Sequence, residues 1–600
     1  MGMQTGNNSD IDVDALRAKY RSERDKRLRK EGNDQYVEVT GEFEKYLDDR
    51  YVEREERDPI TDEVEVVIIG GGFGGLLAGA RLREEGFEDI RVIEKGGDFG
   101  GTWYWNQYPG AQCDIESYIY LPLLEETGYM PREKYSFAPE ILEHSQAIAR
   151  KYALYDNALF QTEVKAMHWD EETFRWELST DRGDRIRAQF VCMSNGPLNR
   201  PKLPGIAGVE KFQGHTFHTS RWDYHYTGGD TTGDLHRLKD KRVAIIGTGA
   251  TAVQCVPHLA ESAQQLYVFQ RTPSSIDVRG NKPTDPTWTE TLEPGWQTRR
   301  MQNFNILVTG GDQEEDLVND GWTDIIRNLG NLNRRDEGDA DDVEAMQAKV
   351  EMADFMKMEQ IRSRVDDMVT DPETAEALKP WYRQFCKRPC FHDDYLKAFN
   401  KPTVTLVDTN GQGVDQITES GIVVDGQHYE VDCLIFATGF EVGTAYTRRA
   451  GYEIVGRDNT RLSDKWANGL VTLHGLQTHD FPNCFFMGVT QGGFTANFPH
   501  MLNEQSLHIA YMMKQCKNSN ANCIEASIEG ENDWVAEIKR MAAFNDQFLQ
   551  ECTPGYYNNE GSPDPSTSLI GSQYGGGPEA FFQIIRDWRS DGTLKGTELS

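Results

Sequence analysis

The stretch 64–75, VEVVIIGGGFGG, decides the fold of this chain. Its apolar half predicts a short buried strand, and the glycines predict a tight turn into a helix. In the pattern G-x-G-x-x-G, Gly70 permits the turn, Gly72 lets a phosphate approach the backbone, and Gly75 lets the helix pack on the strand. Free N–H groups at a helix N-terminus bind a pyrophosphate. Residues 64–94 therefore predict a βαβ unit that binds a dinucleotide.

A second stretch, 243–252 (VAIIGTGATA), has the same organisation, with Ala252 in place of the third glycine. The residue after the second strand distinguishes the two units. Glu94 accepts hydrogen bonds from a free ribose diol, whereas Arg271 pairs with a 2′-phosphate, and Thr272 offers it a further donor. We therefore expect an α/β fold with two Rossmann-like domains, the first for FAD and the second for NADPH.

Composition restricts the partners of the chain. The 600 residues are 38% hydrophobic and carry a formal net charge of −34. Such a polyanion repels phosphate backbones and anionic lipids, so no nucleic acid or membrane partner is expected. None of the ten cysteines forms a C-x-x-C pair, and we expect reduced thiols in a cytoplasmic protein. No metal ligand is predicted, and the oligomeric state is left open.

Changes in pattern along the chain predict its domain organisation. Charged residues and helical spacing at Val13, Leu16 and Tyr20 indicate a helical arm docked on the body. A segment rich in Asp, Glu, Arg, Met and Gln indicates a helical insertion. The expected parts are an N-terminal helical arm (1–60), the FAD domain (61–200 and 433–600, including a C-terminal loop), a linker and NADP domain (201–275 and 385–432), and the insertion (276–384).

Two dinucleotide sites in one chain predict hydride transfer from NADPH to the flavin. A disulfide reductase would need a redox-active cysteine pair, and the sequence contains no C-x-x-C. An oxygenase needs instead a site that shields the activated flavin from water. The residues thus favour an oxygenase and leave a simple FAD reductase as an alternative.

Two longer motifs point to one family. Residues 212–223, FQGHTFHTSRWD, fit F-x-G-x-x-x-H-x-x-x-W-[P/D] and include His218, Trp222 and Asp223. Residues 100–114 fit [A/G]-G-x-W-x-x-x-x-[F/Y]-P-G-x-x-x-D and end at Asp114. From residue 61 onward the chain resembles the type I Baeyer–Villiger monooxygenases. The N-terminal arm and residues 100–124 further resemble the subgroup of cyclopentadecanone and polycyclic ketone monooxygenases.

The resemblance implies roles for single residues. Arg388 and Asp114 would be catalytic, and Lys387 would contact the 2′-phosphate. His218 would lie in an interdomain linker just before the NADP domain and, with Trp222 and Asp223, would couple domain movement to cofactor binding. Tyr556 or Tyr557 would cap the nicotinamide. The implied FAD contacts are Gly70, Gly72, Phe73, Gly75, Glu94, Gly101, Thr102, Trp103, Asp114 and Tyr120, and the implied NADP contacts are Gln112, Gly247, Thr248, Gly249, Ala250, Thr251, Ala252, Val253, Arg271, Thr272, Lys387 and Arg388.

The resemblance implies insertion of one oxygen atom from O2 beside the carbonyl of a cyclic or bulky polycyclic ketone, giving an ester or lactone. A C4a-peroxyflavin would attack the carbonyl, and the guanidinium of Arg388, anchored by Asp114, would stabilise the negative tetrahedral adduct. Arginine stays protonated and does not quench the peroxide as a general acid would. The alternative is an N- or S-hydroxylating flavin monooxygenase, against which the pairs Trp222-Asp223 and Lys387-Arg388 argue.

Overall fold

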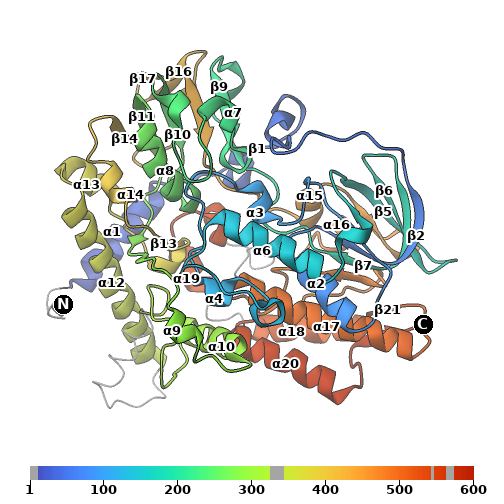
Figure 1. Ribbon diagram of the computed structural model, residues 1–600. Helices are drawn as coiled ribbons and strands as arrows, with labels where there is room; N and C mark the ends of the chain where they lie inside the picture. The colour runs from blue at the N-terminus through green and yellow to red at the C-terminus, as the bar shows by residue number, and fades with distance from the viewer. Residues whose placement is uncertain (1–10, 325–342, 542–545, 563–572) are drawn as a thin grey trace.

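The computed structural model describes residues 11–324, 343–541, 546–562 and 573–600. Two sheets of largely parallel strands form separate α/β units, at the right and at the upper left of Figure 1. The predictions for residues 1–10 of the arm, 325–342 of the insertion and 563–572 of the C-terminal loop lie outside the described residues.

The first sheet carries the glycine-rich turn at residues 70–75. Its central strand β2 (Thr61–Ile69) lies between β7 (Arg185–Met193) and β3 (Ile90–Ile93), both parallel to it. Helix α2 (Phe73–Glu84) follows the turn and packs against α17 (Phe498–Asn518) in one buried apolar cluster. The sheet is completed by β4 (Ala158–Leu159), β5 (Val164–Asp170), β6 (Arg175–Thr180), β19 (Ile454–Val455) and β20 (Cys484–Phe486).

The second sheet carries the turn at residues 247–252. Its five parallel strands run in the order β14 (Val404–Asp408), β11 (Gln265–Gln270), β10 (Arg242–Ile246), β18 (Cys433–Phe436) and β9 (His215–His218). Helix α8 (Ala250–Ser262) follows the turn. Alternation of strand and helix thus builds two dinucleotide-binding folds, as expected.

Two sequence expectations about this sheet are wrong. The segment 433–436 was expected in the FAD domain, but Cys433–Phe436 pairs with β10 and so extends the NADP sheet. His218 was expected in an interdomain linker, but it ends the edge strand β9, where Phe436 is its partner in register. An apolar strand can join either of two similar sheets, and nothing local to its sequence distinguishes them.

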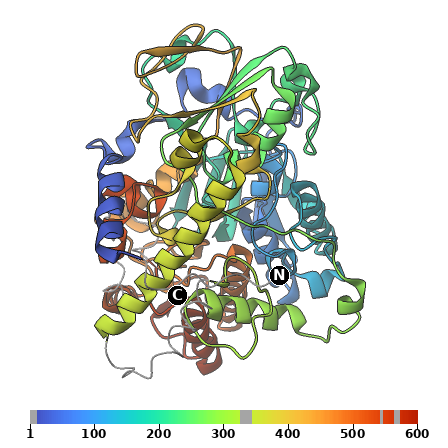
Figure 2. The ribbon, with the colours of Figure 1, turned by 90° about the vertical axis from the view of Figure 1, so that its left-hand side faces the viewer.

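The insertion and the arm pack on the second unit. The insertion includes α10 (Trp296–Val308), α12 (Val343–Met368) and α13 (Pro372–Leu378). The long α12 crosses the face seen in Figure 2, beside α1 (Val13–Asp25) of the arm. Arg362 of α12 donates to the hydroxyl of Tyr20 at 3.0 Å, which fixes the arm to the insertion.

The expectation of ten reduced thiols is also wrong. Cys386 and Cys552 form a disulfide across 166 residues, and the other eight cysteines are free. The cytoplasmic location, which rested partly on reduced thiols, stays a prediction. Within the described part of the chain, no helix has both the length and the apolar character needed to cross a membrane.

Candidate functional site

The turn after β2 forms one wall of a cavity. Gly70 has a φ of +107°, and a Cβ there would lie 2.2 Å from the carbonyl oxygen of Ser194, so the turn requires glycine. A Cβ at Gly75 would lie 1.9 Å from the carbonyl oxygen of Gly70. The cavity has about 1100 Å³ of open space, including its mouth. Eight predicted FAD contacts line it: Gly70, Gly72, Phe73, Glu94, Gly101, Thr102, Trp103 and Tyr120.

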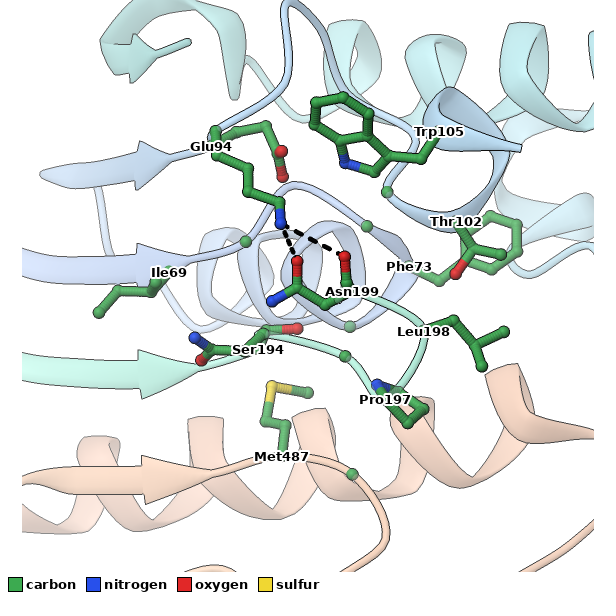
Figure 3. A pocket seen from close by; sticks show the side chains of 18 of the residues that line it. Ile69, Phe73, Glu94, Thr102, Trp105, Ser194, Pro197, Leu198, Asn199 and Met487 are labelled. Atoms are coloured by element: carbon green, nitrogen blue, oxygen red, sulfur yellow. Dashed lines mark hydrogen bonds between the residues drawn. The ribbon is translucent and has the colours of Figure 1, made fainter. Parts of the chain in front are cut away.

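Glu94 follows β3 and points into this cavity. Figure 3 shows Glu94 and Trp105 on one side, with Ser194 and Met487 opposite. The carboxylate accepts backbone N–H groups of Gly71 and Gly96, each at 2.6 Å. Burial raises the pKa of Glu94, against the effect of these two bonds. Because a carboxylate offers about four acceptor sites, two are left for the hydroxyls of a ribose.

The second glycine-rich turn opens onto free space. Gly247 has a φ of +111°, and a Cβ there would lie 2.4 Å from the carbonyl oxygen of Ala437. Gly249 caps α8, and nothing lies within 4 Å of the place its Cβ would take. The hydroxyl of Thr248 donates to the carbonyl of Thr272 at 2.8 Å and fixes the turn to the end of β11. Open space before a helix N-terminus fits a pyrophosphate.

Positive side chains gather where the 2′-phosphate is predicted. Arg271 follows β11 and donates to the side-chain oxygen of Gln35 at 2.8 Å. Thr272 accepts a hydrogen bond from Arg27 of the arm at 3.1 Å. Burial and the neighbouring Arg271 lower the pKa of Lys387 to about 8. The structure therefore brings Arg271, Thr272 and Lys387 together.

Arg388 and Asp114 meet across the two units. Nε and Nη2 of Arg388 donate to Oδ2 and Oδ1 of Asp114 at 3.0 and 2.6 Å. Burial disfavours the charged guanidinium, but Asp114 outweighs it and holds the pKa of Arg388 well above its ordinary value. The side chain of Arg388 is still 32% exposed, and its guanidinium lies 5.5 Å from the ring centre of Trp322. One face of a fixed cation is thus left for a ligand.

Gln112, another predicted NADP contact, lies in the contact between the two units. Its side-chain amide donates to the carbonyl of Tyr135 at 2.7 Å and accepts from Arg279. Its backbone carbonyl accepts from Gln254 of α8 at 2.8 Å. These contacts explain how residues 108–114 of the first unit are held against the first turns of α8.

The three residues predicted to couple the domains have structural partners. His218 is fully buried and shares a hydrogen bond with Ser220 at 2.8 Å. Burial and Arg221 lower its pKa to about 3, so it is neutral near pH 7. Trp222 donates to Thr227 at 3.1 Å. The carboxylate of Asp223 contacts His215 at 2.9 Å and Arg50 of the arm at 2.8 Å. The coupling role itself stays a prediction.

Sequence reasoning missed Arg27 and Glu560, which adjoin Arg271, and Lys202, which adjoins Glu560. Arg27 donates to the carbonyl of Arg271 at 3.1 Å, and the Glu560 carboxylate lies 3.1 Å from Lys202 and 3.2 Å from Arg271. Arg27 lies on the arm and Lys202 in the segment between the two units, where no motif signalled them. Glu560 lies in the C-terminal loop, where the resemblance pointed only to Tyr556 and Tyr557.

Comparison with known proteins fits this geometry. A model of the pyridine nucleotide-disulphide oxidoreductase family matches residues 67–315, which include both glycine-rich turns. The neopentalenolactone D synthase of Streptomyces avermitilis is 56% identical over 592 residues, covering 98% of this chain and 99% of that protein. A Baeyer–Villiger monooxygenase of Streptomyces coelicolor is 47% identical, with coverage of 96% and 95%. The chain belongs to the type I Baeyer–Villiger monooxygenases.

One solved Baeyer–Villiger relative is similar over its whole length. The polycyclic ketone monooxygenase of the thermophilic fungus Thermothelomyces thermophila is 38% identical, with a TM-score of 0.90 and coverage of 98% of this chain and 99% of that one. The predicted fold class is confirmed. As a member of this family the enzyme uses FAD and NADPH to oxygenate ketones. The family decides against the N- or S-hydroxylating alternative.

Proposed function

We propose that this Baeyer–Villiger monooxygenase acts on bulky, fused-ring ketones at Arg388, with FAD in the cavity at Gly70 and NADPH at the turn around Gly247. The observation that carries the proposal is the bidentate Arg388–Asp114 pair, which joins the two units at a partly exposed cation. Bound FAD, once reduced by NADPH, supplies the electrons that activate O2. The protein supplies position, charge and exclusion of water.

Arg388 would hold the ketone through its carbonyl oxygen. When the carbonyl carbon becomes tetrahedral, negative charge develops on that oxygen, and a guanidinium already fixed in place stabilises it without reorganisation. Asp114 would act through Arg388, because both of its oxygens accept from the guanidinium. Arg388 keeps its proton, since its pKa lies well above the ordinary value.

The two nucleotide assignments rest on the residues after β3 and β11. Glu94 has acceptor sites left for a ribose diol, whereas Arg271, Thr272 and Lys387 bring donors and positive charge to one place. The FAD assignment extends to Gly75 and Asp114, and the NADP assignment to Ala250, Thr251, Ala252 and Val253 in the first turn of α8.

Preference for bulky ketones is supported by the neighbours of Arg388. Apolar side chains from the insertion, from residues 115–119 and from Phe391 form a buried cluster next to the catalytic pair. It comprises Ile115, Ile119, Met301, Phe304, Val318, Trp322 and Phe391. The solved relative of 38% identity is described as a polycyclic ketone monooxygenase.

A panel of ketones tests the proposal. The FAD-loaded enzyme would be supplied with NADPH and with ketones of one small ring, one large ring and two or more fused rings. We expect ester or lactone from all that react and the highest kcat/KM for fused rings. A clear preference for the small single ring would contradict the proposed substrate class.

A further inference from the structure

A carboxylate from the C-terminal loop lies among the cations predicted to bind the 2′-phosphate. Glu560 belongs to the short helical segment η10 (Tyr556–Gly561). Its Oε1 lies 3.1 Å from Nζ of Lys202 and its Oε2 lies 3.2 Å from Nη2 of Arg271. The side chains of Glu560 and Lys202 are only 4% and 8% exposed. The contact is therefore a buried, specific one rather than a surface ion pair.

Three cations surround this one carboxylate. Burial favours the protonated form of Glu560, but Lys202, Arg271 and Lys387 outweigh it and lower the pKa of the carboxyl to about 2. Two further contacts bring no additional negative charge to the three cations. Nζ of Lys202 lies 3.7 Å from the ring centre of Tyr36, which is uncharged, and Glu23 is paired with Arg27 at 2.9 Å. The cluster thus has an excess positive charge that one carboxylate does not neutralise.

The same donors cannot serve Glu560 and a phosphate equally well. A phosphate monoester carries about −1.5 to −2 charges at neutral pH, and a carboxylate on Arg271 would repel it at short range. Without Glu560, the three cations would match the phosphate charge better. The carboxylate must leave for the phosphate to take both Lys202 and Arg271.

The segment that carries Glu560 is held in a conformation suited to release. Asn559 and Glu560 have φ values of +50° and +57°, and consecutive left-handed residues other than glycine store strain. The disulfide between Cys552 and Cys386 fixes the start of this segment beside Lys387. Just before this segment, the backbone carbonyl of Gln550 in α19 (Asp546–Glu551) accepts from Arg24 of α1 at 3.0 Å. These anchors do not involve Glu560, so its ion pairs can break without detaching the segment.

We propose that Lys202 is a ligand of the 2′-phosphate of NADPH and that Glu560 occupies the place of this phosphate until the nucleotide displaces it. This inference rests on the proposed function, in which Arg271 binds the 2′-phosphate. It makes Glu560 a determinant of nucleotide affinity, and it assigns the C-terminal loop a role in distinguishing NADPH from NADH.

Binding of NADP⁺ and NAD⁺ to the FAD-loaded enzyme, measured by calorimetry, tests the proposal. Glu560→Gln should lower the Kd of NADP⁺ about tenfold, and Lys202→Met should raise it about tenfold, with NAD⁺ changed less than about twofold. The matched control is Glu531→Gln, because Glu531 is another buried carboxylate, 3.3 Å from Lys465, on α18 (Ile528–Met541). The control should change neither Kd.

Hydrogen exchange on the parent enzyme provides a measurement without a variant. The amide of Glu560 donates to the carbonyl of Gly555 at 2.8 Å, and NADP⁺ but not NAD⁺ should make it exchange faster. Slower exchange with NADP⁺, weaker NADP⁺ binding by Glu560→Gln, or equal changes in Kd for NADP⁺ and NAD⁺ would overturn the proposed role of Glu560. Arg271→Ala distinguishes a failure of the proposed function from a failure of this inference alone. If it weakens NADP⁺ and NAD⁺ equally, the proposed phosphate site is wrong; if it is selective for NADP⁺ while Glu560→Gln has no effect, only this inference fails.

Discussion

Asp114→Asn should impair oxygen insertion through its effect on Arg388. In the parent, the carboxylate accepts two hydrogen bonds from the guanidinium, at 3.0 and 2.6 Å. Asparagine keeps one acceptor, removes the charge and turns an N–H donor toward the guanidinium. Breaking a fully buried ion pair costs about 3–5 kcal/mol. Because Arg388 is 32% exposed, solvent screening reduces this to about 2–3 kcal/mol.

The kinetic effect is expected mainly in kcat. Misplacing a preorganised donor to a developing oxyanion lowers kcat roughly 10²–10³-fold, so Asp114→Asn should lose on the order of 10²-fold and Arg388→Ala at least as much. Since Asp114 acts through Arg388, the double variant should be no slower than Arg388→Ala alone. The assay is ester formation per NADPH consumed, with flavin content measured for each variant.

Asp184→Asn is the matched control for this prediction. Asp184 lies in the turn between β6 and β7 and accepts two hydrogen bonds from Arg57, at 2.6 and 2.7 Å. Its loss should lower the melting temperature and leave kcat for ketones unchanged. The reasoning is refuted if Asp114→Asn retains near-parent ester formation, or if the effects of Asp114→Asn and Arg388→Ala simply multiply in the double variant.

Three further predictions concern the nucleotide, the disulfide and pH. Arg271→Ala should raise the KM for NADPH by roughly tenfold or more and that for NADH less than about twofold; equal effects would argue against the 2′-phosphate role. Thiol titration of the unfolded, unreduced protein should find the eight free cysteines, and a count of ten would contradict the Cys386–Cys552 bond. Burial opposes ionisation of Asp184, but Arg57 and Thr180 lower its pKa to about 2. Its contribution to stability is therefore present above the unfolded pKa, near 4, and is lost as the pH falls toward 2. Urea unfolding should show the gap between parent and Asp184→Asn narrowing in that range; a constant gap would contradict the shift.

The parts predicted from the sequence are those where ligand chemistry restricts the residues. Gly70 and Gly247 have φ values that favour glycine and face backbone carbonyls at distances that leave no room for a Cβ, so their spacing was visible in the sequence. The roles of Arg388 and Asp114 needed the family resemblance. They lie 274 positions apart in the chain, and only the fold brings them together.

What the sequence did not predict depends on which segments meet in the folded chain. Cys386 and Cys552 follow no spacing rule across 166 residues. All four residues of the strand Cys433–Phe436 are apolar and buried, and such a strand fits the interior of either sheet. Glu560 reaches Lys202 and Arg271 because η10 packs between the arm and the second unit, and a glutamate in a polar loop does not signal such a contact.

Isotope tracing tests the central claim most directly. The FAD-loaded enzyme would be given NADPH, a fused-ring ketone and ¹⁸O2, and the product analysed by mass spectrometry. Insertion beside the carbonyl predicts a lactone that carries one ¹⁸O atom for each NADPH consumed in coupled turnover, and Arg388→Ala should abolish it while FAD stays bound. NADPH consumption with unlabelled, unchanged ketone would contradict the account, as would undiminished lactone formation by Arg388→Ala.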